Sequence, residues 1–152
     1  MTQFYPVFSH SLLLAVTVST VFAASPLNVH IEVAELIGGL GVNEPFTASG
    51  AAVDNGVICA SGMVQDVSVS TSGAPSAPYR NIQVLKRFTC GTDTFDVRMV
   101  VKLDLATNFT TASWSIVGGT GVYADLRGRG SLVGTPIDPG SSIFDVYDGS
   151  VH

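Results

Sequence analysis

The chain has 152 residues, of which only 12% are charged, and this length suits one domain with one core. Its formal net charge is −5, and no lysine or arginine precedes Arg80. A cationic stripe for phosphate contacts is therefore missing, so we expect no nucleic-acid partner and no binding to an anionic membrane surface.

Residues 1–23 have the pattern of a signal peptide. The apolar run from Leu12 to Val18 is too short to span a bilayer, and Val21-Phe22-Ala23 supplies a cleavage site. We therefore expect a secreted, periplasmic or extracellular chain over residues 24–152, without stable membrane insertion. An apolar first strand is the alternative interpretation of this segment.

The rest of the chain has the composition that is typical of strands and turns. Alternating or β-branched segments are separated by glycine- and proline-rich breaks, and no helical periodicity is long enough for a helix. We expect about eight strands in a single antiparallel β-barrel, because a meander of hairpins closes without exposed edges. The outer strands are expected over residues 28–37, 46–53, 128–133 and 143–152, and the central ones between residues 57 and 118.

The central strands can be paired through their turns. If the loop over residues 71–78 closes a symmetric hairpin, Cys59 lies directly opposite Cys90, where a disulfide can form. An exported chain with two cysteines usually pairs them, and two buried free thiols are the alternative.

The next two turns set the following registers. A turn at residues 91–92 pairs Phe88 with Phe95. A turn at residues 107–108 pairs Val101 with Trp114 and Met99 with Ile116.

These registers sort the side chains onto an apolar and a polar face, a split that a one-residue slip would destroy. The apolar face carries Cys59, Met63, Val67, Val69, Ile82, Val84, Phe88, Cys90, Phe95, Val97, Met99, Val101, Leu103, Trp114 and Ile116. The polar face includes Asp66, Arg87, Asp96 and Arg98, with Arg87 opposite Asp96 in an exposed ion pair. If the barrel were inside out, these four residues would line a polar cavity able to bind a ligand or support acid–base chemistry.

Lys86 is the exception, because it falls on the apolar face. A lysine inside the barrel needs a charged partner and would mark a ligand or catalytic group. We favour a β-bulge or a snorkelling stem that brings Lys86 to solvent. The candidate ligand-binding residues are Lys86, Arg80, Trp114 and Tyr123.

A glycine-rich segment, Gly118-Gly119-Thr120-Gly121-Val122-Tyr123, follows the strand that ends Trp114-Ser115-Ile116-Val117. We interpret Gly118, Gly119 and Gly121, which can adopt positive φ, as a sharp structural turn, with Tyr123 and Leu126 plugging a barrel end. A phosphate-binding loop is disfavoured, because no helix and no Lys-Ser/Thr pair follow.

This segment resembles the GGTG-x-aromatic segment of the allene oxide cyclase and dirigent barrel superfamily. The resemblance covers the last third of the chain well and the remainder by strand order only. It implies an eight-stranded barrel with a central cavity, often trimeric, whose members cyclise an epoxide or steer radical coupling. No catalytic residue can be assigned from it.

No other motif defines a site. His30 and His152 would meet if the terminal strands pair, but their spacing is no metal signature, and we expect no metal or cofactor. The Asn108-Phe109-Thr110 sequon lies at a predicted hairpin tip and matters only in a eukaryotic source.

Two functions remain open. The favoured one is a non-catalytic secreted barrel that binds a small apolar ligand or acts as an extracellular structural module. The alternative is a cofactor-free cyclase or dirigent-type guide, which would need at least two placed polar groups in the lumen.

Overall fold

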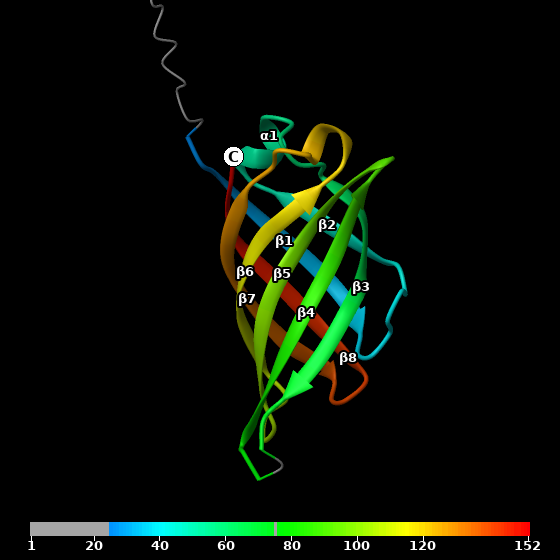
Figure 1. Cartoon of the computed structure of the whole chain (residues 1–152), viewed down its shortest axis with the longest axis vertical. Coiled ribbons are helices and arrows are strands. Elements are labelled where there is room, and N and C mark those ends of the chain that lie inside the picture. The colour runs from blue at the N-terminus through cyan, green and yellow to red at the C-terminus, as the bar shows by residue number, and fades with distance from the viewer. Residues whose placement is uncertain (1–24, 75) are drawn as a thin grey trace, which may run out of the picture.

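The computed structural model describes residues 25–74 and 76–152, so the predicted signal peptide lies outside the described residues. Eight strands form one closed antiparallel barrel in which each strand pairs with its neighbours and β8 pairs with β1 (Figure 1). The all-β barrel predicted from the sequence is thereby confirmed. Its elements are β1 (Leu27–Leu36), β2 (Glu44–Ser49), α1 (Ala51–Asp54), β3 (Ser61–Ser72), β4 (Tyr79–Cys90), β5 (Asp93–Asp104), β6 (Thr110–Gly119), η1 (Gly121–Tyr123), β7 (Gly128–Asp138) and β8 (Ser142–Val151).

The two ends of the barrel differ. Helix α1 and the C-terminus lie together at one end, which we call the α1 end, and the β3–β4 hairpin projects from the other, the hairpin end (Figure 1). The expectation of a strand over residues 46–53 is wrong in part, because β2 stops at Ser49 and Gly50, at a φ of 103°, leads into α1. No helix in the described part of the chain is long and apolar enough to cross a membrane.

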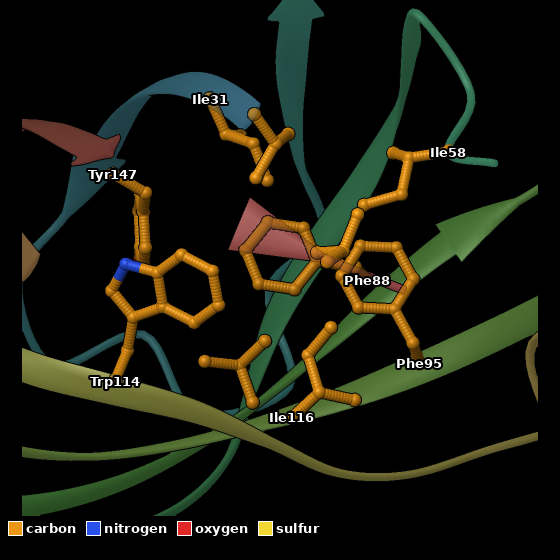
Figure 2. Close-up of a pocket in the computed structure, with 10 residues that line it drawn as sticks. Ile31, Ile58, Phe88, Phe95, Trp114, Ile116 and Tyr147 are labelled. Carbon is orange, nitrogen blue, oxygen red and sulfur yellow. The ribbon is translucent and has the colours of Figure 1, made fainter. Parts of the chain in front are cut away.

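Aromatic side chains fill the lumen towards the α1 end. Phe88 stacks on Phe95 at 5.0 Å between ring centroids and meets Phe46 and Tyr147 edge to face. The space that remains between these rings and Trp114 is a cavity of about 10 Å³ (Figure 2), which holds one water molecule at most. This half of the barrel is a packed core and leaves no room for a substrate.

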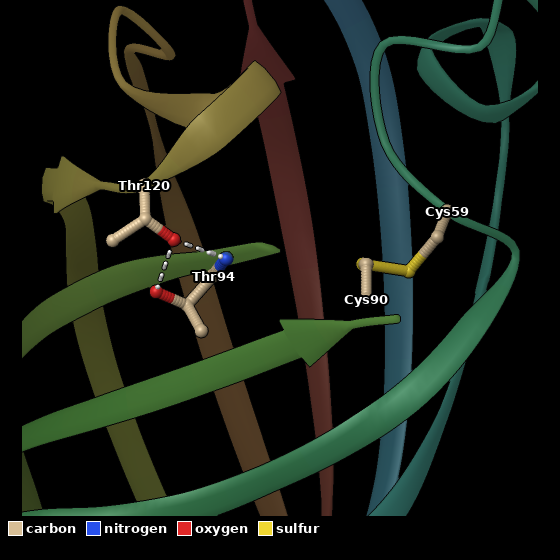
Figure 3. The surroundings of a disulfide bond; sticks show 4 residues. All are labelled: Cys59, Cys90, Thr94 and Thr120. Carbon is tan, nitrogen blue, oxygen red and sulfur yellow. Dashed lines mark hydrogen bonds between the residues drawn. A yellow bond between two sulfur atoms is a disulfide. The ribbon is translucent and has the colours of Figure 1, made fainter. Parts of the chain in front are cut away.

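The Cys59–Cys90 disulfide is present, with 6.0 Å between the Cα atoms (Figure 3), but the register proposed for it is wrong. Cys59 precedes β3, and Val64 rather than Met63 shares the inner face with Phe88. The 71–78 loop is not symmetric, and a bulge between Asp66 and Ser68 shifts the pairing once more.

The shifted register explains why Val64 rather than Met63 reaches the core. Val64 is fully buried, whereas Met63, Val67 and Val69 are about two-fifths exposed.

The β4–β5 register is confirmed, with Phe88 opposite Phe95. The β5–β6 register is two residues away from the prediction, because Met99 pairs with Trp114. A shift of two residues keeps each side chain on its expected face, so Met99, Val101, Trp114 and Ile116 are buried as predicted.

The glycine-rich segment forms the turn that closes the α1 end. Tyr123 and Leu126 are both buried there, and Tyr123 packs edge to face on Phe95, as predicted. Of the three glycines, only Gly121 has a positive φ, of 54°. Gly118 and Gly119 are the last two residues of β6, so the expectation that all three glycines form the turn is wrong in part.

The same turn is tied to β5 by a threonine pair. The backbone N–H of Thr94 donates to Thr120 Oγ1 at 2.9 Å, and the two hydroxyl oxygens lie 3.1 Å apart (Figure 3).

Candidate functional site: a charged cluster inside the barrel

Four charged side chains from four strands meet inside the barrel. Glu35 comes from β1, Asp66 from β3, Lys86 from β4 and Asp145 from β8, and we call them the charged cluster. The phenol of Tyr147, on β8, faces the same carboxylates. The cluster lies on the side of the aromatic core that faces the hairpin end. Tyr147 belongs to both, because its ring packs on Phe88.

Lys86 is the centre of the cluster. Its Nζ donates to Asp66 Oδ1 at 2.6 Å and also to Glu35 Oε2. Only 5% of the lysine is exposed, so its charge depends on these two carboxylates. The favoured interpretation that Lys86 reaches solvent is wrong, since the β3 bulge follows Asp66 and leaves Lys86 paired with Asp66 on the inner face.

Asp66 was assigned to the polar outer face, and the structure places it inside. The reason is the register error in β3, where Asp66 lies opposite Lys86 and shares the inner face with Val64. The side chain of Asp66 is 16% exposed, compared with 8% for Glu35. Asp66 is therefore the member of the ion-pair network nearest to solvent.

Sequence reasoning singled out neither Glu35 nor Asp145 as a site residue. Strand alternation carried the signal for both. Glu35 continues the inward series of Ile31 and Val33 in β1. Asp145 lies between the inward-facing Ile143 and Tyr147 in β8.

When Glu35 and Asp145 are ionised, three buried polar atoms of this region have no hydrogen-bond partner among the described residues: Glu35 Oε1, Asp145 Oδ1 and Tyr147 Oη. The three residues are each less than 8% exposed. An unpaired buried polar atom costs about 1–3 kcal/mol, and such atoms are rare in folded proteins. Their convergence at one place indicates a binding or reaction site rather than a structural ion pair alone.

Burial is the main cause of the unusual acidities in the cluster. Desolvation raises the pKa of Glu35 to about 7, against the opposing effect of Lys86. Desolvation likewise raises the pKa of Asp145 to about 6, although Lys86 and a hydrogen bond with Glu35 act in the other direction. Burial also raises the pKa of Tyr147 well above its usual value.

Lys86 is held in its charged form. Burial lowers the pKa of Lys86, but the carboxylates of Glu35 and Asp66 outweigh that effect and raise it above its ordinary value. The lysine is therefore a fixed cation, while the proton of the Glu35–Asp145 pair is the mobile one near neutral pH.

The loop between β1 and β2 borders the cluster. It follows Leu36, the last residue of β1, and contacts β3, where the Gly41 N–H donates to the carbonyl oxygen of Asp66 at 3.0 Å. Four large apolar side chains at the end of β1 and in this loop, between 43% and 60% exposed, form what we call the apolar loop: Leu36, Ile37, Leu40 and Val42.

The other candidate ligand-binding residues do not join the cluster. Arg80 donates to the carbonyl oxygens of Ala74 and Ala77 at 3.0 and 3.3 Å, in the β3–β4 loop. Trp114 lies in the aromatic core, where its Nε1 donates to the carbonyl of Ser131 at 2.9 Å. Tyr123 closes the α1 end.

The polar cavity proposed for an inside-out barrel does not form. The bidentate pair of Arg87 and Asp96 lies on the outer face, as first expected, with N–O distances of 2.8 and 2.9 Å. Arg98 is exposed two residues further along β5. Only Asp66 of the four faces the lumen.

His30 and the acidic groups near it form a separate surface contact. Its Nδ1 lies 2.7 Å from Asp148 Oδ1 and its Nε2 lies 3.3 Å from Glu32 Oε1, so carboxylates contact it where His152 was expected. Hydrogen bonds to Asp148 and Glu32 raise the pKa of this histidine. Within residues 25–74 and 76–152, no group of three His, Cys, Asp or Glu side chains could hold a metal ion.

The fold and the site together define a closed eight-stranded antiparallel barrel with a packed aromatic half and a buried charged cluster. No protein-family model matches the chain, and no curated protein or solved structure matches it either. The resemblance of the glycine-rich segment to allene oxide cyclase and dirigent barrels therefore stays a sequence-based expectation.

Proposed function

We propose that this protein is a secreted barrel that binds a small molecule, without catalysis, at the charged cluster. The observation that carries the proposal is the convergence of three unpaired polar atoms, Glu35 Oε1, Asp145 Oδ1 and Tyr147 Oη, at one place inside the barrel. A ligand that supplies hydrogen bonds to them removes a cost of about 1–3 kcal/mol per atom. A purely structural module has no comparable use for unpaired acceptors.

Export and oligomerisation belong to the same proposal. The Cys59–Cys90 bridge is compatible with an oxidising compartment, and the pattern of residues 1–23 supports a signal peptide. The trimer implied by the resemblance is tested by light scattering on the purified protein, where a monomer mass would exclude it.

The binding proposal is tested by a thermal-shift screen of small organic compounds on the disulfide-bonded protein. Compounds that raise the melting temperature should lose their effect in Asp145→Asn and keep it in Asp148→Asn. The control carries the same change on the same strand, but its side chain is exposed and contacts His30. Compounds that stabilise both variants equally, or a screen without any stabilising compound, would contradict binding at the cluster.

A second candidate is a cofactor-free isomerase or cyclase, as the resemblance implies. It is favoured by the burial of Glu35 beside Asp145, which raises the pKa of Glu35 to about 7, because a general acid–base group works best near the ambient pH. Proton NMR of each bound compound in deuterated buffer separates the two functions. Deuterium incorporation or a new product that disappears in Glu35→Gln would favour the enzyme, and unchanged spectra favour the carrier.

A further inference from the structure

The ligand class follows from the charges and unpaired atoms of the cluster, provided that the proposed binding function holds. Glu35, Asp66 and Asp145 face a single cation, Lys86. When all three carboxyl groups are ionised, the site carries an excess of negative charge that attracts a cation and repels an anion. The two hydrogen bonds of Lys86 go to Glu35 and Asp66, which leaves Asp145 without a cationic hydrogen-bond partner among the described residues.

The number and kind of unpaired atoms narrow the choice of cation. Glu35 Oε1, Asp145 Oδ1 and Tyr147 Oη all have lone pairs to offer. An ammonium group has three N–H donors and no acceptor, so it matches these three atoms one to one. It is also more compact than a guanidinium group, which suits a site whose side chains are nearly all buried.

The side chains around the site indicate what the rest of the ligand is like. The apolar loop begins next to Glu35 in the sequence and pairs with the backbone of Asp66 through Leu40 and Gly41. Leu36 and Leu40 are 60% and 59% exposed. Exposed apolar side chains beside a buried polar site favour a ligand with an apolar part that covers them.

We propose that the charged cluster binds a primary ammonium group carried on an apolar chain, with the ammonium at Glu35 and Asp145 and the chain against the apolar loop. On binding, the ammonium takes the place of the proton held between these two carboxyl groups, and that proton leaves to solvent. No bond to carbon is made or broken.

Release of a proton makes binding depend on pH. The groups that face the Glu35–Asp145 pair are Lys86 on β4, Asp66 on β3 and Tyr147 on β8, with Glu44 on β2 acting on Asp145 at longer range. Of these, Lys86 stays charged and Tyr147 stays neutral at neutral pH. An alkylammonium ion stays charged as well, so affinity should rise with pH as the carboxyl pair loses its proton, by roughly 10-fold between about pH 5.5 and 8.

Isothermal titration calorimetry with octylammonium, octanoate and octanol, each below its micelle concentration, tests the class of ligand. We expect octylammonium to bind at least 10-fold more tightly than the other two probes and more tightly at the higher pH. Asp145→Asn should abolish this preference, while Asp148→Asn should retain it. Tighter binding of octanoate or octanol, or affinity that is independent of pH, would overturn the ammonium assignment.

The exposed Leu40 gives a second variant that does not endanger folding. Leu40→Ser should weaken octylammonium several-fold and leave methylammonium, which has no chain, unchanged. Equal loss for both probes, or none for either, would contradict the role of the apolar loop.

The outcomes also separate this inference from the proposed function. If compounds from the screen require Asp145 but octylammonium does not bind, the ammonium class is refuted and the proposed binding function stands. Octylammonium that binds equally well to Asp145→Asn would place it elsewhere on the protein and refute the ligand class at this site. Failure of both the probes and the screen would refute both proposals.

Discussion

Lys86 Nζ lies 2.6 Å from Asp66 Oδ1 in the lumen of a barrel whose other half is packed with aromatic rings. A buried lysine of this kind is tolerated only while its carboxylate partners remain. The pair therefore links stability to function, because the side chains that hold Lys86 belong to the same cluster as the unpaired atoms of the proposed site.

Removal of the lysine should be costly. Lys86→Met leaves Glu35 and Asp66 without their cation, and loss of one partner from a buried pair typically costs about 3–5 kcal/mol. Urea unfolding followed by Trp114 fluorescence would measure the change in unfolding free energy.

The double variant Lys86→Met with Glu35→Gln provides the control for charge. It should be more stable than the sum of the two single variants indicates, since it removes both charges of one pair. Strict additivity would contradict the coupling of Lys86 to Glu35.

The unfolding free energy should fall as the pH rises through the acid-to-neutral range. Glu35 and Asp145 have ordinary pKa values of 4.5 and 3.8 and folded-state values of about 7 and 6. The unfolded chain therefore loses these protons first, and stability declines from about pH 4 to about pH 7 and then levels. At about 1.4 kcal/mol per pKa unit, the expected loss is on the order of 6 kcal/mol for the pair.

Denaturant unfolding at about pH 5 and about pH 8 would measure this dependence. Glu35→Gln should flatten it, because an amide does not titrate, while Asp96→Asn on the outer face should not. Higher stability of the wild type at pH 8 than at pH 5 would contradict burial of the carboxyl pair.

The sequence predicted what depends on local pattern. Alternation in β5 and the tight turn after Cys90 gave the correct β4–β5 register and the Arg87–Asp96 pair. Burial of Tyr123 followed from its place after the glycine turn.

The pairing register of a strand depends also on non-local packing, and the sequence alone did not predict the register of β3. The bulge after Asp66 and the asymmetric 71–78 loop moved the β3 register, and with it Asp66, to the inner face. Neither feature has a distinct sequence signature, since a bulge is a single extra residue. Glu35 and Asp145 did follow the inward alternation, but a charged residue at an inward position is normally discounted because burial is costly.

Loss of the disulfide should destabilise the fold without removing it. The bridge joins residues 31 apart in the sequence, and a closed loop of this length stabilises by roughly 3–4 kcal/mol in the chain-entropy model. The double variant Cys59→Ser with Cys90→Ser should therefore unfold at a lower urea concentration, with native circular dichroism before the transition. An unchanged midpoint would mean that aromatic packing alone holds the α1 end.

Gly118 and Gly119 offer a matched pair of substitutions in the glycine-rich segment. Neither has a positive φ, so the effect of alanine depends on space alone. A methyl at Gly119 would lie 2.3 Å from the carbonyl oxygen of Tyr123 and 2.9 Å from that of Thr94, whereas one at Gly118 meets nothing within 4 Å.

Gly119→Ala should therefore force the turn that carries Tyr123 away from β5 and lower the unfolding free energy by about 2 kcal/mol or more. Gly118→Ala should stay within about 0.5 kcal/mol of the wild type. Because both carbonyl groups belong to the backbone, no side-chain rotation relieves the contact at Gly119. Equal melting temperatures for the two variants would show that the turn after β6 is free to move away from β5, and that the plug formed by Tyr123 does not depend on close backbone approach.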